Sequence, residues 1–143
     1  ALIHKGNLYL DQATSGEELS EYHLEAAIAA THARATSFET TDWNKILLLY
    51  DLLSQIKSDP IIELNKAIAT GYGKSAAEGL AYLKIVKGLE NNSIYYAALG
   101  DFYSRLADHA SAKEQYEKAV SLTQSASEID LLKTKIDALE SYL

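Results

Sequence analysis

The 143-residue sequence has no cysteine and no methionine, a single proline and only seven glycines. Without cysteine, the chain can form neither a disulfide bond nor a thiolate-bound zinc or iron–sulfur centre. The absence also fits a reducing compartment, so we expect a cytoplasmic protein. Because so little proline and glycine interrupts the chain, helices are favoured over many short strands. The missing initiator methionine predicts that the sequence is a fragment of a longer chain.

Basic residues are outnumbered as well: 13 Lys and Arg stand against 20 Asp and Glu, for a net charge of −7. Nucleic-acid-binding domains usually carry a basic stripe, so we expect no direct DNA contact. No apolar run approaches the ~20 residues that a bilayer-spanning helix needs, and no signal-peptide core is visible. We therefore predict no membrane association. A hydrophobic content of 48% is sufficient for one domain with a sizeable core.

Apolar residues recur with helical spacing along most of the chain, and local signals mark where helices start. Ser20, Thr41 and Asp59 each precede a helical run as candidate N-caps. Pro60 suits the first helical position, and Gly71 predicts a helix end. The predicted helices cover residues 2–13, 20–34, 42–56, 60–70, 75–87, 94–106 and 110–123, with a last helix after residue 125.

A spaced pattern of large and small residues occupies residues 93–126. Its members are Tyr96, Leu99, Gly100, Tyr103, Ala112, Tyr116 and Ala119. The pattern resembles a tetratricopeptide repeat (TPR), in which small residues let two helices approach closely while large residues fill the gaps. About 35 residues upstream, Ala77 keeps the small position and Asn65 replaces the glycine. One repeat earlier, Ala30 takes the close-approach position.

This resemblance implies an all-α fold, a TPR-like right-handed helical solenoid of about eight helices. We expect a single domain with an N-terminal helix and turn, three antiparallel helix pairs and a C-terminal capping helix. These parts are residues 1–20, then 21–57, 58–92 and 93–126, and finally 127–143. Several stacked pairs are needed because one repeat cannot bury its apolar face alone.

Two features with an enzymatic appearance are better explained by local structure. The segment GYGKS at 71–75 lacks the glycine that a phosphate-binding loop needs five residues before its Gly-Lys pair, so we interpret it as a helix end, a turn and a serine cap. The histidines lack the spacing of a helical metal pair, and His109 is expected to be solvated in a turn. No set of catalytic groups converges in the sequence. We predict no metal, no cofactor and no enzymatic activity.

Glu25 and His32 share one helical face because they are seven residues apart, but about 10 Å separates them along the axis. That distance excludes a direct hydrogen bond, so they either satisfy neighbouring helices or line a groove for a peptide. Trp43 is either a core anchor or an aromatic contact for a partner. Asn65 either bonds to its neighbours or holds a peptide backbone through its amide.

Five phrases occur in order along the chain: YHLEAAIAATHA, TDWNKILLLYDLL, PIIELNKAIA, GLAYL and YYAALGDFYSRLADHASAKEQYEKAV. From about Leu2 to Tyr142 they resemble the C-terminal TPR-like extension of bacterial extracytoplasmic-function (ECF) RNA polymerase sigma factors. In that family, upstream sigma domains bind core RNA polymerase and promoter DNA, and this sequence contains neither domain. The resemblance implies a domain that regulates or supports the sigma factor in transcription initiation.

The implied partners are the sigma domains of the parent chain, core RNA polymerase or both, with DNA contacted only through the absent parent domains. The residues of these phrases that we predict to form the partner-binding face are Glu25, His32, Asp42, Trp43 and Asn65. Two alternatives remain open. One is a general TPR adaptor outside transcription, and the other is a helical small-molecule sensor with a closed pocket around Glu25, His32 and Trp43.

Overall fold

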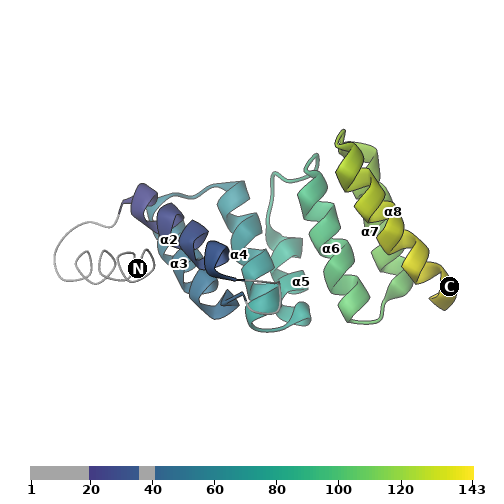
Figure 1. Cartoon of the computed structure of the whole chain (residues 1–143), viewed down its shortest axis with the longest axis horizontal. Coiled ribbons are helices and arrows are strands. Elements are labelled where there is room, and N and C mark those ends of the chain that lie inside the picture. The colour runs from purple at the N-terminus through teal and green to yellow at the C-terminus, as the bar shows by residue number, and fades with distance from the viewer. Residues whose placement is uncertain (1–19, 36–40) are drawn as a thin grey trace.

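The computed structural model describes residues 20–35 and 41–143, and within these ranges it contains helices and no strand. Figure 1 shows the helices following one another along the long axis of the molecule. They are α2 (Glu21–Arg34), α3 (Trp43–Ile56), α4 (Pro60–Gly73), α5 (Ala76–Ile85), α6 (Ser93–Arg105), α7 (His109–Leu122) and α8 (Ala126–Leu139), followed by the 3-10 turn η1 (Glu140–Tyr142). The predicted all-α solenoid is confirmed. The predicted helix 2–13 lies outside the described residues.

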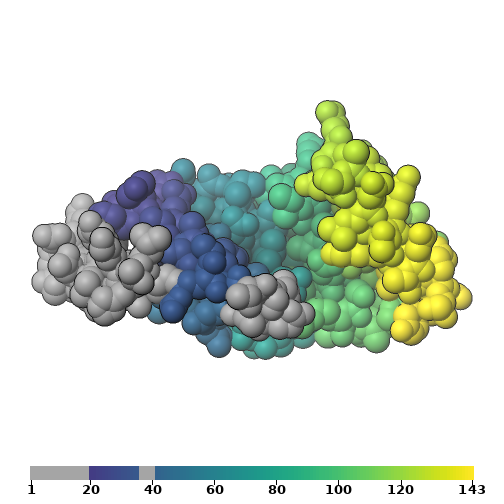
Figure 2. Space-filling view, viewed as in Figure 1, coloured from purple at the N-terminus to yellow at the C-terminus, as the bar shows by residue number. Residues whose placement is uncertain are grey.

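Successive helices pack as pairs, and each pair stacks on the next. Helix α2 packs on α3, α4 on α5, and α6 on α7, while α3 also contacts α4 and α5 contacts α6. Helix α8 packs against α7 and closes the C-terminal end, where the space-filling view shows it in yellow (Figure 2). None of the described helices combines the length and apolarity that crossing a bilayer would require.

A polar side chain caps the start of each α-helix from α2 to α8 by accepting a backbone N–H. Ser20 does so for α2, and Asp59 does so for α4 directly before Pro60, as the sequence predicted. The prediction for α3 is wrong by one residue. Asp42, rather than Thr41, is the N-cap, and its Oδ1 accepts the N–H of Lys45 at 3.1 Å.

Helix α4 continues through Gly71 to Gly73, so the predicted helix end at Gly71 is wrong. The reason is a close approach between α4 and α5 at Gly71 and Gly79, where a Cβ atom on Gly79 would overlap the Cα of Gly71. The side chain of Phe102 from α6 covers the same point, because a Cβ atom on Gly71 would overlap its ring. We call Gly71 and Gly79 the glycine notch. The fully buried Phe102 fills this notch and thereby joins the second helix pair to the third.

The repeat pattern predicted for α6 and α7 is present. In the two earlier helix pairs, the close-approach positions lie at other residues than the sequence predicted. A Cβ atom on Gly100 would lie 2.5 Å from Cε1 of Tyr116, and Ala112 is fully buried. Ala77 is exposed, because the glycine notch supplies the close approach of its pair. Ala30 is only half-buried, and Ala27 takes the buried position on α2.

The apolar core runs across the boundaries between helix pairs. One cluster joins α2, α3 and α4 through Leu24, Leu49 and Ile62. A second cluster includes Leu64 of α4 and Phe102 of α6. Each helix pair therefore buries its apolar face only by stacking on its neighbour, as expected for a helical repeat.

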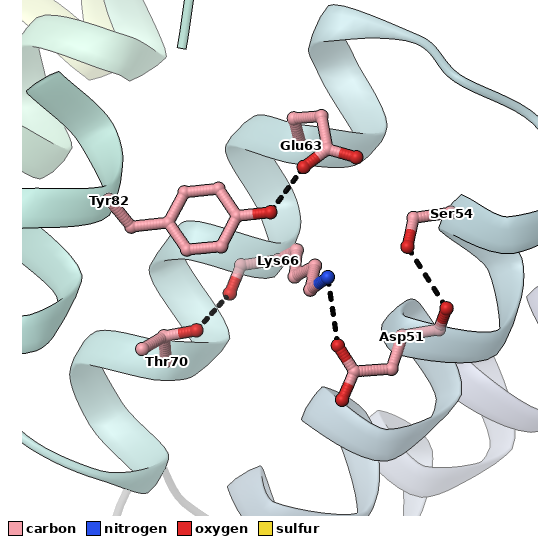
Figure 3. Close-up of polar contacts among 6 residues, drawn as sticks. All are labelled: Asp51, Ser54, Glu63, Lys66, Thr70 and Tyr82. Atoms are coloured by element: carbon pink, nitrogen blue, oxygen red, sulfur yellow. Dashed lines mark hydrogen bonds and ion pairs between the residues drawn. The ribbon is translucent and has the colours of Figure 1, made fainter. Parts of the chain in front are cut away.

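Polar contacts supplement this core between α3, α4 and α5 (Figure 3). The Lys66 ammonium lies 2.9 Å from Oδ1 of Asp51 on α3. Tyr82 of α5 donates a hydrogen bond from its hydroxyl to Glu63 of α4, and the Lys66 ammonium lies 5.7 Å from the Tyr82 ring centroid. Burial, followed by the hydrogen bond to Glu63, raises the pKa of Tyr82 to about 12. Glu63 and Lys66 thus connect α4 to the helices on both sides.

The glycine notch gives a direct test of the packing between pairs. Replacing glycine by alanine in an exposed helix usually stabilises it, but Gly79→Ala would push α4 and α5 apart. We expect Gly79→Ala to lower the free energy of unfolding by about 1–3 kcal/mol, as for other overpacked positions. Urea denaturation followed by circular dichroism measures this change. Ala77→Ser on the exposed side of the same helix is the control, and an equal loss in both variants would contradict the assignment.

Candidate functional site

Glu25 and Asn65 come from different helices but meet at the same side chain. The side chain of Asn65 on α4 and the charge of the exposed Glu25 on α2 both act on the hydroxyl of Tyr50 on α3. Burial and the charge of Glu25 raise the pKa of Tyr50, and the side chain of Asn65 opposes this rise. Three helices therefore contribute to one row of polar side chains, which we call the polar row.

A second row is aromatic and connects four helices. The exposed His32 ring of α2 contacts the half-buried Trp43 of α3 edge-on, with 5.7 Å between the ring centroids. Trp43 lies 5.0 Å from Tyr72 of α4, and Tyr72 lies 5.3 Å from Phe102 of α6. The Arg105 guanidinium of α6 covers the Tyr72 ring at 5.1 Å from its centroid. We call these rings the aromatic row, and it ends in the glycine notch.

The two rows lie on the same faces of α2, α3 and α4. Each of these helices gives one residue to each row, and the two residues from a helix are seven positions apart, which places them on one side of the helix. The pairs are Glu25 with His32, Tyr50 with Trp43, and Asn65 with Tyr72. We call the surface that the two rows form the two-row face.

Asp101 extends this face toward the C-terminal end. Its Oδ1 accepts the Tyr116 hydroxyl of α7 at 2.6 Å and the Lys135 ammonium of α8 at 2.9 Å. Burial raises the pKa of Tyr72 to about 12, with the charge of Asp101 adding to the rise and Arg105 opposing it. Burial and the hydrogen bond to Asp101 also raise the pKa of Tyr116. One carboxylate therefore links α4, α6, α7 and α8.

An apolar groove lies between α6 and α8, and Lys135, the ion-pair partner of Asp101, is one of its lining residues. Its volume is about 170 Å³. Ile94 and Leu131 flank it and are 52% and 56% exposed, respectively. The lining residues are Ser93, Ile94, Ala97, Glu128, Leu131, Leu132 and Lys135. We call this feature the α6–α8 groove.

The five predicted site residues have different structural roles. Glu25 and His32 are exposed on the two-row face, whereas Trp43 and Asn65 are half-buried within it. Asp42 is exposed and caps α3, so it fixes where that helix begins directly before Trp43. Glu25 and Asn65 thus both influence Tyr50, whereas His32 contacts Trp43 directly.

Among the site residues that are at least partly exposed, sequence reasoning missed five: Tyr50, Tyr72, Asp101, Arg105 and Lys135. Seven-residue spacing could have found two of them, because Tyr50 follows Trp43 and Tyr72 follows Asn65 by that interval. Asp101, Arg105 and Lys135 make contacts that depend on how α6 and α8 pack against neighbouring helices. The spacing of residues within one helix does not predict this packing.

The other candidate motifs have structural explanations. GYGKS at 71–75 contains the last turn of α4 and the Ser75 cap of α5. The expectation that His109 is solvated is wrong, because its ring is half-buried and stacks on Tyr142 at 4.1 Å between centroids. In residues 20–35 and 41–143, no three His, Asp or Glu side chains gather as metal ligands would.

Comparison with known proteins finds a relative that matches nearly the whole chain. An uncharacterized protein of Rhizobium meliloti (strain 1021) is 31% identical over 139 residues, which are 96% of this chain and 33% of the relative. The chain therefore spans about a third of the length of the curated relative that it matches. No protein-family model matches the chain, and no solved structure matches it significantly.

The raised pKa of Tyr72 makes stability depend on pH in the alkaline range. Below the ordinary tyrosine pKa of about 10 the folded and unfolded chains both keep the proton, so the contribution of this side chain is complete there. It is lost as the pH rises toward the folded pKa of about 12. We expect the free energy of unfolding to fall between pH 10 and 12.

Tyr72→Phe should reduce this alkaline loss by about 1 kcal/mol, after allowance for solvent screening of a partly exposed side chain. Urea denaturation at closely spaced alkaline pH values measures the effect. Tyr22→Phe, which removes a hydroxyl from a 75% exposed side chain, is the control. An alkaline loss in Tyr72→Phe equal to that of the wild type would show that Tyr72 does not titrate as described.

Proposed function

We propose that the chain is the regulatory, protein-interaction domain of an ECF-type RNA polymerase sigma factor. It acts in transcription initiation by contacting the sigma domains of its parent chain, core RNA polymerase or both. The observation that carries the proposal is the ordered set of five phrases, which resembles the C-terminal extension of these sigma factors along nearly the whole chain. The length of the Rhizobium relative supports it, because two thirds of that protein remain for other domains.

The two-row face supplies a surface suited to docking. Its exposed groups are Glu25 and His32. Beneath them lies a layer of half-buried side chains, which we call the floor and which includes Trp43 and Asn65. Binding to a preorganised surface loses less conformational entropy than binding to a flexible one. Glu25 and His32 are the contact residues in this proposal, Trp43 and Asn65 form the floor, and Asp42 fixes the start of α3.

Charge supports a protein partner in preference to DNA. The chain has a net charge of −7, which suits a basic partner surface and repels phosphate. We propose that DNA is contacted only through other domains of the parent. The polar groups of the two-row face are spread over several helices, an arrangement that suits an extended interface better than a catalytic centre.

A binding measurement with purified components tests this proposal. The immobilised 143-residue chain is exposed separately to the sigma domains of its parent and to core RNA polymerase in biolayer interferometry. We expect the wild type to bind at least one of them. The double variant Glu25→Gln, His32→Ala should weaken this binding about fivefold or more, because two exposed contact groups are lost while the buried floor remains.

Leu48→Ser is the matched control, since Leu48 is exposed on α3 away from Trp43 and Tyr50. Circular dichroism confirms that each variant is folded. Binding to neither partner would refute the docking proposal. A parent reading frame without sigma domains would instead favour the general TPR adaptor.

A further inference from the structure

We infer that the α6–α8 groove is the docking site for a basic segment of a protein partner, which inserts one large apolar side chain between Ile94 and Leu131 and places a lysine or arginine against Glu128. This inference rests on the proposed function only in that the domain binds a protein. It names the chemistry of the segment and adds a site beyond the two-row face.

The shape of the groove fits one apolar side chain. Apolar cavities of about 150 Å³ can hold a benzene molecule, and this groove measures about 170 Å³. Ala97 and Leu132 form its floor, and the flanking Ile94 and Leu131 are both more than half exposed. An inserted leucine or phenylalanine would bury these two side chains, and this burial is the main source of affinity.

The charges around the groove specify what accompanies the apolar side chain. Lys135 is already paired with Asp101 at 2.9 Å, so its charge is largely compensated within the domain. Glu128 accepts a hydrogen bond from the Thr123 hydroxyl, but among the described residues no cation lies within ion-pair distance of it. Within the described residues, the groove therefore offers one negative charge without an ion-pair partner, next to an apolar surface.

The position of Glu128 sets where the cation belongs in the segment. Glu128 and Leu131 are three residues apart on α8, so their side chains lie about 5–6 Å from each other on one face. A lysine or arginine adjacent to the apolar anchor has the reach to pair with Glu128. Acidic segments are disfavoured both by Glu128 and by the net charge of −7.

The same charge argues against a second copy of this chain as the occupant. Two copies would bring together surfaces that each belong to a chain of charge −7, and this repulsion opposes association unless an apolar interface is large. The groove offers only two exposed aliphatic side chains. A basic partner segment gains from both the charge and the apolar contact.

Fluorescence anisotropy with synthetic peptides tests the inference on the 143-residue chain. Three short labelled peptides of equal length are compared: one with a central leucine flanked by lysines, one with the leucine flanked by glutamates, and one with serine in place of the leucine between lysines. We expect the leucine–lysine peptide to bind at least about tenfold more tightly than the other two, since they lack either the cation or the apolar anchor.

Variants then locate the site. Leu131→Ser and Ile94→Ser should each weaken the leucine–lysine peptide about tenfold, and Glu128→Gln should weaken it about threefold with a smaller dependence on salt. Leu48→Ser is the control for lost apolar surface, because Leu48 is 57% exposed on α3 and Leu131 is 56% exposed on α8. Glu114→Gln, at an exposed position on α7, is the control for lost charge.

The inference is overturned if the leucine–lysine peptide does not bind, if the leucine–glutamate peptide binds equally well, or if Leu131→Ser and Leu48→Ser have equal effects. Self-association of the wild type in analytical ultracentrifugation that Leu131→Ser abolishes would also overturn it, in favour of a second copy. Peptide binding at the groove without binding to sigma domains or polymerase supports the inference and refutes the proposed function. Binding to those partners without any binding of the leucine–lysine peptide supports the proposed function and refutes the inference.

Discussion

Stacking of the second and third helix pairs depends on the packing of Phe102 in the glycine notch. The notch exists because Gly71 and Gly79 let α4 and α5 touch backbone to backbone, and the fully buried ring of Phe102 fills the remaining space. Without this contact, the second and third pairs would lose their largest shared buried side chain. A helical repeat without such contacts between pairs cannot bury its core.

The contact between Phe102 and the glycine notch also positions the candidate site. Tyr72 packs on Phe102, Trp43 packs on Tyr72, and His32 packs on Trp43, so the notch fixes one end of the aromatic row. Asp101 lies next to Phe102 in sequence and ties α6 to Tyr116 of α7 and to Lys135 of α8. Packing and the arrangement of the site are therefore coupled in this domain, because the exposed His32 packs on Trp43 and Trp43 packs on the ring of Tyr72 from the next helix.

Much of the fold follows from local sequence signals. Helix starts at Ser20, Asp59 and Ser125 could be predicted because a cap is a short-range event between a side chain and a nearby N–H. The repeat at Gly100 and Tyr116 could be predicted because one hairpin contains both residues.

The shifted close approach of the second pair could not be predicted in this way. From sequence alone, Gly71 predicts a helix end. The structure shows that it lies within α4 because the ring of Phe102 from α6 occupies the space that a Cβ atom would need. Similarly, Glu25, Trp43 and Asn65 could be selected from sequence, but the links through Tyr50 and Tyr72 depend on tertiary stacking. Helical periodicity shows which residues share a face of one helix and does not show which faces meet.

The central claim is that partners dock on the two-row face, to which α2, α3 and α4 contribute. Hydrogen–deuterium exchange on the chain, alone and bound to a partner that we propose, sigma domains or core RNA polymerase, tests it most directly. The account predicts that bound partner slows exchange in α2 (Glu21–Arg34), α3 (Trp43–Ile56) and α4 (Pro60–Gly73), with α5 and α7 unchanged. Slowed exchange confined to α5 and α7 in a complex of demonstrated affinity would contradict it.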